Sequence, residues 1–283
     1  MKTIAVTNHK GGSAKTTTAV NLASALGEQG FRVLVIDTDP QGSATSWLGS
    51  PVAGRDVLDV YTGQGDLAGF AVSTSAPGVQ LVPSTPWLVA ADRRRETDLA
   101  LGVMRAIEAL PPRWDYVFVD CPPLQGYLGI APLSACQQAL VPVEAHVLAL
   151  SGLVSLLDAM QEVRARLNPE LTLSAIVACR VSHTRHAREV VDRLRGHYPS
   201  HVLGAVVRES IRLAEAPSFQ LPITRYAPSS DSAKDYRAVA AEFLERQQVR
   251  VEAASGASLA GFPHRHAESL VAWAGAGGTV ANG

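Results

Sequence analysis

Cysteine is scarce in this 283-residue chain, and its scarcity excludes several kinds of site. The three cysteines, Cys121, Cys136 and Cys179, show no close spacing. They therefore predict neither a disulfide scaffold nor a CxxC redox or cysteine-zinc site. The eight histidines likewise show no HExxH or other zinc spacing. A reducing, cytosolic setting is expected for such a composition.

Long hydrophobic runs and a strong net charge are also lacking. No stretch of about 18 uninterrupted apolar residues occurs, so no transmembrane helix is predicted. The opening residues, MKTIAVTNHKGG, carry no apolar run long enough for a signal peptide. The formal net charge is −1, so any surface that binds a polyanion must be local. Hydrophobic residues make up 47% of the chain and charged residues 18%, which allows a sizeable core.

Lysine is rare as well, although basic residues are not. Only four of the 25 basic residues are lysine, and the others are arginine. Two of the four, Lys10 and Lys15, lie in one short loop. In this arginine-rich background, the pair draws attention to that loop.

The hydrophobic pattern predicts an α/β fold: a single domain over residues 1–248 with a mostly parallel, helix-covered, twisted sheet, whose assignment as a P-loop domain rests on the motifs described below. Predicted strands cover residues 2–8, 31–37, 79–84, 115–121, 138–144, 173–179 and 202–207, and predicted helices cover 15–29, 87–110, 147–167, 184–197 and 231–248. Residues 50–78, rich in Gly and Asp, are expected to form a looser excursion. Residues 249–283 are rich in Ala and Gly with almost no charge, which predicts a disordered tail.

A phosphate-binding loop is predicted between the first strand and the first helix. Successive backbone N–H groups and the helix N-terminus favour phosphate there, and two glycines allow close approach. Lys15 would reach the β- and γ-phosphates of a nucleotide, and the Thr16 hydroxyl would bind Mg²⁺. Ala14 needs a φ that Ala can adopt, or strain of order 1 kcal/mol or more. The predicted nucleotide contacts are Lys10, Gly11, Gly12, Ser13, Ala14, Lys15, Thr16 and Thr17.

Three carboxylates are predicted to complete this site. Asp37 and Asp39 follow one apolar strand, and Asp120 ends another. Because the carboxyl ends of parallel strands converge on the nucleotide crevice, these side chains should meet there. An aspartate at the end of a buried strand is costly unless it faces ions or donors, so Asp120 is a candidate partner for a Mg²⁺-bound water.

These motifs together resemble those of the ParA/MinD family of P-loop ATPases. KGGSAKT (10–16) is similar to the deviant Walker A motif, DTDPQG (37–42) to switch I, and DCPP (120–123) to the Walker B and switch II region. The segment IRLAEAPSFQLPITRYAPSSDSAKDYRAVAAEFL (211–244) is similar to the C-terminal half of partition ParA ATPases. The resemblance covers residues 1–248.

The resemblance implies a role for several residues. Lys10 would reach across a dimer interface to the partner's nucleotide, where a cation stabilises charge that develops in phosphoryl transfer. Asp39 would position or activate the attacking water, and Asp37 would support the Mg²⁺ shell. The family usually has Gly where this chain has Ala14. The predicted catalytic residues are thus Lys10, Lys15 and Asp39, and the predicted metal residues are Thr16, Asp37 and Asp120.

A local basic surface is the remaining signal. Residues 180–212 hold seven arginines and three acidic residues. Arg185 and Arg188 would share a helix face. The resemblance implies binding of duplex DNA without sequence preference, through Arg212 first and then Arg188 and Arg185. Phosphate contacts of this kind weaken steeply with salt. The alternative to DNA binding is that these arginines belong to a solvated helix face. Arg208 is a separate case, because it lies at a strand end and would border the adenine.

The sequence is therefore identified as a member of the ParA type. The resemblance implies a cytoplasmic, nucleoid-associated, Mg²⁺-dependent ATPase that dimerises with ATP and acts with a ParB-like partner, without membrane contact. The alternatives are a MinD-like membrane ATPase, which needs a basic amphipathic C-terminal helix, and a positioning ATPase for another cargo. A nitrogenase-type reductase would need cluster-ligating cysteines, and a pure binding module would need an inactive site.

Overall fold

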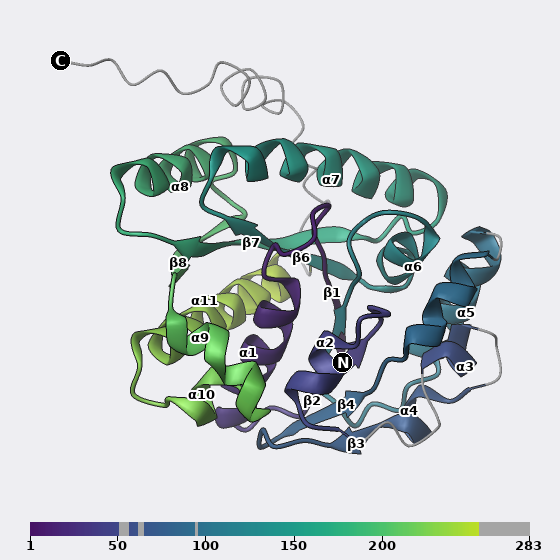
Figure 1. The fold of residues 1–283 in the computed structure, drawn as a ribbon. Coiled ribbons are helices and arrows are strands. Elements are labelled where there is room, and N and C mark those ends of the chain that lie inside the picture. Colours follow the sequence, from purple (N-terminus) through teal and green to yellow (C-terminus); the bar gives the residue numbers. More distant parts are fainter. Residues whose placement is uncertain (51–56, 62–64, 94–95, 255–283) are drawn as a thin grey trace.

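One eight-stranded sheet organises the part of the chain that the computed structural model describes, namely residues 1–50, 57–61, 65–93 and 96–254 (Figure 1). The strands run in the order β3-β4-β2-β5-β1-β6-β7-β8. Only β3 is antiparallel to its neighbour, and the other pairs are parallel. This arrangement confirms the predicted α/β class. The strands are β1 (Lys2–Val6), β2 (Val33–Asp37), β3 (Val72–Ser73), β4 (Val79–Val82), β5 (Tyr116–Asp120), β6 (Gln138–Glu144), β7 (Thr172–Val181) and β8 (Val202–Arg208).

Helices cover both faces of the sheet, which explains why its central strands are apolar on both sides. On one face, α1 (Lys15–Glu28) and α11 (Asp231–Ala254) pack Leu22 and Phe243 into a core that also holds Phe118. On the other face, α5 (Glu96–Glu108), α6 (Tyr127–Ala135), α7 (Val147–Arg166) and α8 (Arg185–His197) supply the second core. Shorter elements are α2 (Ser43–Trp47), α3 (Val57–Tyr61), α4 (Leu67–Phe70), α9 (Ile211–Glu215) and α10 (Ile223–Tyr226), with 3₁₀ segments η1 (Pro86–Arg93) and η2 (Ala216–Phe219).

Some of the predicted helices and strands differ from those in the structure. The predicted helix 87–110 is η1 followed by α5, with residues 94–95 outside the description. The predicted strand 31–37 begins only at Val33, because the Phe31 N–H still donates to the Leu26 carbonyl oxygen at the end of α1. Helix α6 was not predicted, because it is apolar around its circumference and contains Pro132. Such a helix shows no amphipathic periodicity.

The last helix extends beyond residue 248, where it was predicted to end. Helix α11 continues to Ala254, and residues 255–283 of the predicted tail lie outside the described residues. Within the described ranges, no helix combines the length and apolar character needed to cross a membrane.

Candidate nucleotide-binding site

Three neighbouring strands deliver the site at their carboxyl ends. Asp37 of β2 is the register partner of Asp120 of β5, and Asp120 is also the partner of Val6 of β1. The loop that leaves β1 and enters α1 therefore lies beside both aspartates. The sheet alignment confirms the expectation that these distant segments meet at one edge.

The loop 9–14 adopts the conformation of a phosphate cradle. Gly12 has φ +76°, and Ala14 has φ 63° and ψ 24°, both in the left-handed region. Ala14 is the N-cap of α1, and no side chain among the described residues caps that end. The first backbone N–H groups of α1 are therefore available to an anion. Asn8 holds the base of the loop, donating to the Pro142 carbonyl oxygen at 2.6 Å.

Lys15 is buried inside this loop rather than extended into solvent. Its side chain is 6% exposed, and Nζ donates to the Lys10 carbonyl oxygen at 3.2 Å. Burial lowers the pKa of Lys15, while the negative charge of Asp120 acts in the opposite direction. A buried ammonium with one backbone acceptor is suited to gain a phosphate as a second partner.

Asp120 is fully buried, and within the described residues neither of its carboxylate oxygens has a hydrogen-bond partner. Burial raises its pKa well above the ordinary range, and the charge of Asp37 adds to this, whereas Thr16 and Lys15 oppose it. Unpartnered buried carboxylate oxygens beside a threonine hydroxyl match the oxygen donors that Mg²⁺ prefers. No group of three or more His, Cys, Asp or Glu side chains in the described ranges could hold a metal ion. The Asp120 carboxylate and the Thr16 hydroxyl fit a Mg²⁺ that would complete its shell with phosphate and water.

Asp37 and Asp39 are placed differently from Asp120. Asp37 is fully buried, and its Oδ2 accepts both the backbone N–H and the hydroxyl of Thr45, at 2.8 and 2.7 Å. Burial raises the pKa of Asp37 to about 6, and the Thr45 bonds act against this rise. Asp39 lines the cavity, and its Oδ1 accepts the Gln41 backbone N–H at 2.9 Å. Asp37 is thus held by protein donors, whereas Asp39 faces the space above the loop.

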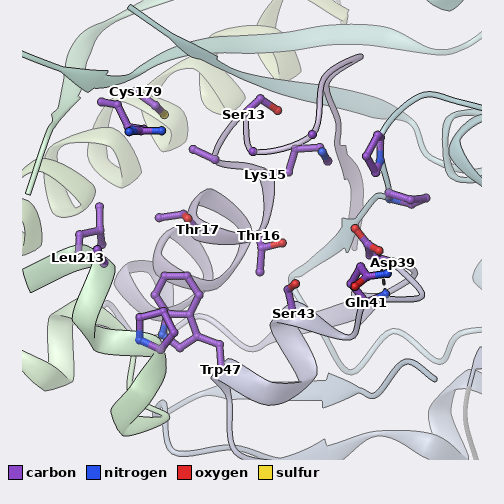
Figure 2. A pocket seen from close by; sticks show the side chains of 18 of the residues that line it. Ser13, Lys15, Thr16, Thr17, Asp39, Gln41, Ser43, Trp47, Cys179 and Leu213 are labelled. Carbon is purple, nitrogen blue, oxygen red and sulfur yellow. Dashed lines mark hydrogen bonds between the residues drawn. The ribbon is translucent and has the colours of Figure 1, made fainter. Parts of the chain in front are cut away.

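A cavity of about 1560 Å³ is lined by Lys15, Thr16 and Asp39, whereas Asp37 and Asp120 lie behind its lining. Figure 2 shows Lys15, Thr16, Asp39, Trp47 and Leu213 around it, contributed by α1, the loop after β2, α2 and α9. The remaining wall comes from the loop after β5 and from the ends of β7 and β8, through Pro122, Pro123, Cys179, Arg180 and Arg208. The volume exceeds what a triphosphate chain needs and leaves room for a nucleoside.

Arg208 lies in the wall of the cavity, and its side chain forms an ion pair with Asp235. Its guanidinium donates to both oxygens of Asp235, at 2.6 to 3.2 Å, and its backbone N–H donates to Asp235 as well. The Asp235 interaction raises the pKa of Arg208. This pair anchors the start of α11 to the end of β8. It leaves the predicted role of Arg208 beside adenine as a prediction.

The side chain of Lys10 differs from that of Lys15 in exposure, although both residues belong to the loop. Lys10 is exposed, and within the described part of the chain it is not part of the cavity wall. Its backbone alone serves the loop, because its carbonyl oxygen accepts from Ser13 and Lys15. The role of Lys10 at a second subunit therefore stays a prediction.

The predicted basic residues are all exposed, but they belong to two elements. Arg185 and Arg188 lie on α8, and Arg185 forms an i,i+4 ion pair with Glu189 at 3.0 Å. Arg212 lies on α9 and lines a second hollow with His183, two residues before α8, and this hollow shares Arg208 with the wall of the nucleotide cavity. The hollow thus connects Arg212 with the beginning of α8. Sequence reasoning did not single out Thr45, Ser84 and Asp235, which carry no motif and act through contacts distant in sequence.

Fold and site together define a P-loop nucleoside triphosphatase of the α/β type, with an extra lysine at the start of its loop. The family model described as "AAA domain" matches residues 1–173. The chromosome-partitioning ATPase Soj of Thermus thermophilus is 41% identical over 250 residues, covering 88% of this chain and 97% of that protein. The sporulation initiation inhibitor protein Soj of Bacillus subtilis is 35% identical, covering 85% and 97%.

A solved structure agrees with these relatives. The protein described as cobyrinic acid a,c-diamide synthase of Mycobacterium smegmatis, with bound ADP and magnesium, superposes with a TM-score of 0.75 at 29% identity, covering 88% of this chain and 96% of that one. The same protein has also been solved with an ATP analogue and magnesium. The chain belongs to the ParA-type family of partition ATPases, as its motifs predicted.

Proposed function

We propose that this protein is a Mg²⁺-dependent, ATP-hydrolysing partition protein. The observation that carries the proposal is the buried Lys15 and the unpartnered Asp120 carboxylate, placed together beneath an uncapped helix N-terminus. The cationic side and the anionic side of this arrangement match a phosphate and a divalent cation respectively. The Mycobacterium smegmatis protein with bound ATP analogue and magnesium supports the same ligand pair.

In the proposed reaction, each group has a distinct task. Lys15 and the N–H groups of loop 9–17 bind the β- and γ-phosphates, with Thr16 and Asp120 on the metal side. Bound Mg²⁺ supplies charge neutralisation at the phosphate oxygens. Asp37 holds the loop that carries Asp39. Asp39 orients the water that attacks the γ-phosphate.

Dimerisation is proposed to complete the site. Lys10 is exposed and does not line its own cavity, so it can act on the nucleotide of a second copy. A cation supplied in this way stabilises the charge that develops in phosphoryl transfer. We expect Lys10→Ala to bind ATP as a monomer and to lose turnover.

Duplex DNA and a ParB-like protein are the proposed partners. Arg212, Arg188 and Arg185 provide exposed cations, and a dimer doubles them into one larger surface, as expected for a nucleoid-associated cytoplasmic protein. Binding of this kind is sequence-independent and salt-sensitive because it rests on phosphate contacts. The partition ATPases among the relatives support this assignment.

The test combines ATP turnover with a DNA gel shift at two salt concentrations. Lys15→Ala should abolish ATP binding, whereas Asp39→Ala should keep binding and stop turnover. Arg212→Ala should weaken ATP-dependent DNA binding and reduce its salt dependence, in contrast to Arg166→Ala. Arg166 is a matched control because it is exposed and forms an i,i+4 pair with Glu162 on α7.

Two results would contradict the proposal. Equal turnover by Asp39→Ala and wild type would remove the assigned role of Asp39. ATP-dependent pelleting with liposomes, without DNA binding, would favour the MinD-like alternative over partition.

A further inference from the structure

A closed ring of hydrogen bonds lies behind the loop after β2, and of its four members only Asp39 lines the cavity. Thr45 donates its hydroxyl to Asp37 Oδ2 at 2.7 Å and accepts the Ser84 backbone N–H at 2.8 Å. Ser84 Oγ donates to the Asp39 carbonyl oxygen at 2.7 Å. The Asp39 backbone N–H donates to Asp37 Oδ1 at 3.2 Å and closes the ring.

The ring is buried and spans three separate segments. Asp37, Thr45 and Ser84 are 0%, 4% and 2% exposed, and they come from the end of β2, from α2 and from the connection after β4. Strands β2 and β4 are neighbours, with Ile36 opposite Val82, so their ends are held at a constant separation. Buried, mutually satisfied polar groups of this kind fix one local geometry.

We propose that Ser84 is a positioning residue for Asp39. This inference rests on the proposed function, in which Asp39 orients the attacking water. Ser84 is not part of the cavity wall among the described residues, so its hydroxyl acts on the Asp39 backbone and not on the nucleotide. Through the Asp39 carbonyl it sets where the carboxylate of that residue stands above the loop.

The contacts of Asp39 explain why Ser84 is the sensitive member of the ring. The Asp39 carbonyl oxygen also accepts the Gly42 N–H at 2.9 Å, which is a local turn bond. Ser84 provides its long-range bond to the sheet, from 45 residues away in the sequence. Without that bond the turn remains closed but can shift relative to Lys15 and Asp120. A displacement of about 1 Å in a catalytic group can lower a rate about 100-fold.

Ser84→Ala is a clean perturbation. It removes one donor, and the Asp39 carbonyl oxygen keeps its Gly42 partner, so no buried polar group is left unpaired. Ser134→Ala is the matched control. Ser134 is also buried, at 4% exposed, and its hydroxyl donates to the Ala131 carbonyl oxygen at 2.7 Å, within α6.

The experiment measures kcat and the Kd for ATP on the full chain, with duplex DNA present. We expect Ser84→Ala to lower kcat about 10-fold or more while the Kd changes less than about twofold, because an interaction used only in the transition state is lost. Ser84→Thr, which retains the hydroxyl, should recover most of the rate. Ser134→Ala should match the wild type.

Non-additivity separates positioning from a general structural effect. Because the two residues act as a unit, adding Ser84→Ala to Asp39→Ala should cause no further loss of turnover. A Ser84→Ala kcat within twofold of wild type would overturn the inference, as would equal losses in kcat and ATP affinity. If Asp39→Ala itself keeps wild-type turnover, the proposed function fails first, so the two failures are distinguishable.

Discussion

Ala14→Gly tests the least usual feature of the phosphate loop, a non-glycine residue in the left-handed region. Ala14 has φ 63° and ψ 24° at the N-cap of α1. For a residue with a Cβ, this conformation costs about 1–2 kcal/mol relative to a right-handed one. Glycine adopts it without that cost. The substitution therefore removes strain from the folded protein.

Two smaller effects oppose this gain in the free energy of unfolding. Glycine raises the entropy of the unfolded chain, which costs about 0.4–1 kcal/mol. The Ala14 methyl is half-buried against the core that contains Leu22, so its loss removes part of about 0.8 kcal/mol. The balance predicts a change in the free energy of unfolding between about zero and 1 kcal/mol in favour of Ala14→Gly. For a chain of this size, 1 kcal/mol corresponds to about 2 °C in Tm.

Ala241→Gly is the control that makes the sign informative. Ala241 is an exposed residue inside the long helix α11, where glycine should cost about 1 kcal/mol. Thermal and urea unfolding of both variants without nucleotide should place Ala14→Gly at or above wild type and Ala241→Gly below it. Equal destabilisation by the two substitutions would refute the explanation from backbone strain.

Two further predictions concern buried charge. Burial raises the pKa of Asp120 well above its usual value and that of Asp37 to about 6, so the folded apoprotein binds protons more tightly than the unfolded chain does. Proton binding by these two carboxyl groups stabilises the folded state fully below about pH 4, the pKa of an aspartate in the unfolded chain. The stabilisation is lost as the pH rises through the pKa values of the two groups in the folded protein. The Tm of Asp120→Asn should therefore exceed that of wild type increasingly between pH 4 and pH 8, and a constant difference would contradict the argument. Asp235→Asn should lower stability by about 1–3 kcal/mol in urea unfolding, because it weakens a partly buried charged pair with Arg208. Its control, Glu162→Gln, breaks an exposed pair and should change stability by less than about 0.5 kcal/mol.

Local sequence signals were sufficient for the elements that build the site. Apolar runs such as YVFVD predicted buried parallel strands, and the parallel order placed Asp37 and Asp120 at one edge. The small-residue loop between strand and helix predicted the phosphate cradle. It also indicated that the backbone of Ala14 is under a conformational constraint, and Ala14 has φ 63° in the structure. These features depend on neighbours close in the chain, so they can be recognised from sequence.

Other features depend on packing between distant segments. Helix α6 has no polar face, so its sequence lacks the amphipathic pattern by which a helix is recognised. The 3₁₀ segment η1 forms where Leu88 is buried while Trp87 stays exposed. Burial overrides local propensity at both places.

What the sequence by itself determined is the inventory of chemistry: a phosphate loop with two lysines, three aspartates at strand ends and an arginine-rich segment. Only the tertiary structure decided which of these groups are buried, which are exposed and which are in contact. Lys15 is buried with Asp120, and Lys10 is exposed. The Ser84 hydroxyl reaches Asp39 across 45 residues of chain. The physical reason is that the hydrogen-bond partners of a buried polar group are set by which strands become neighbours, and strand order is a property of the whole fold.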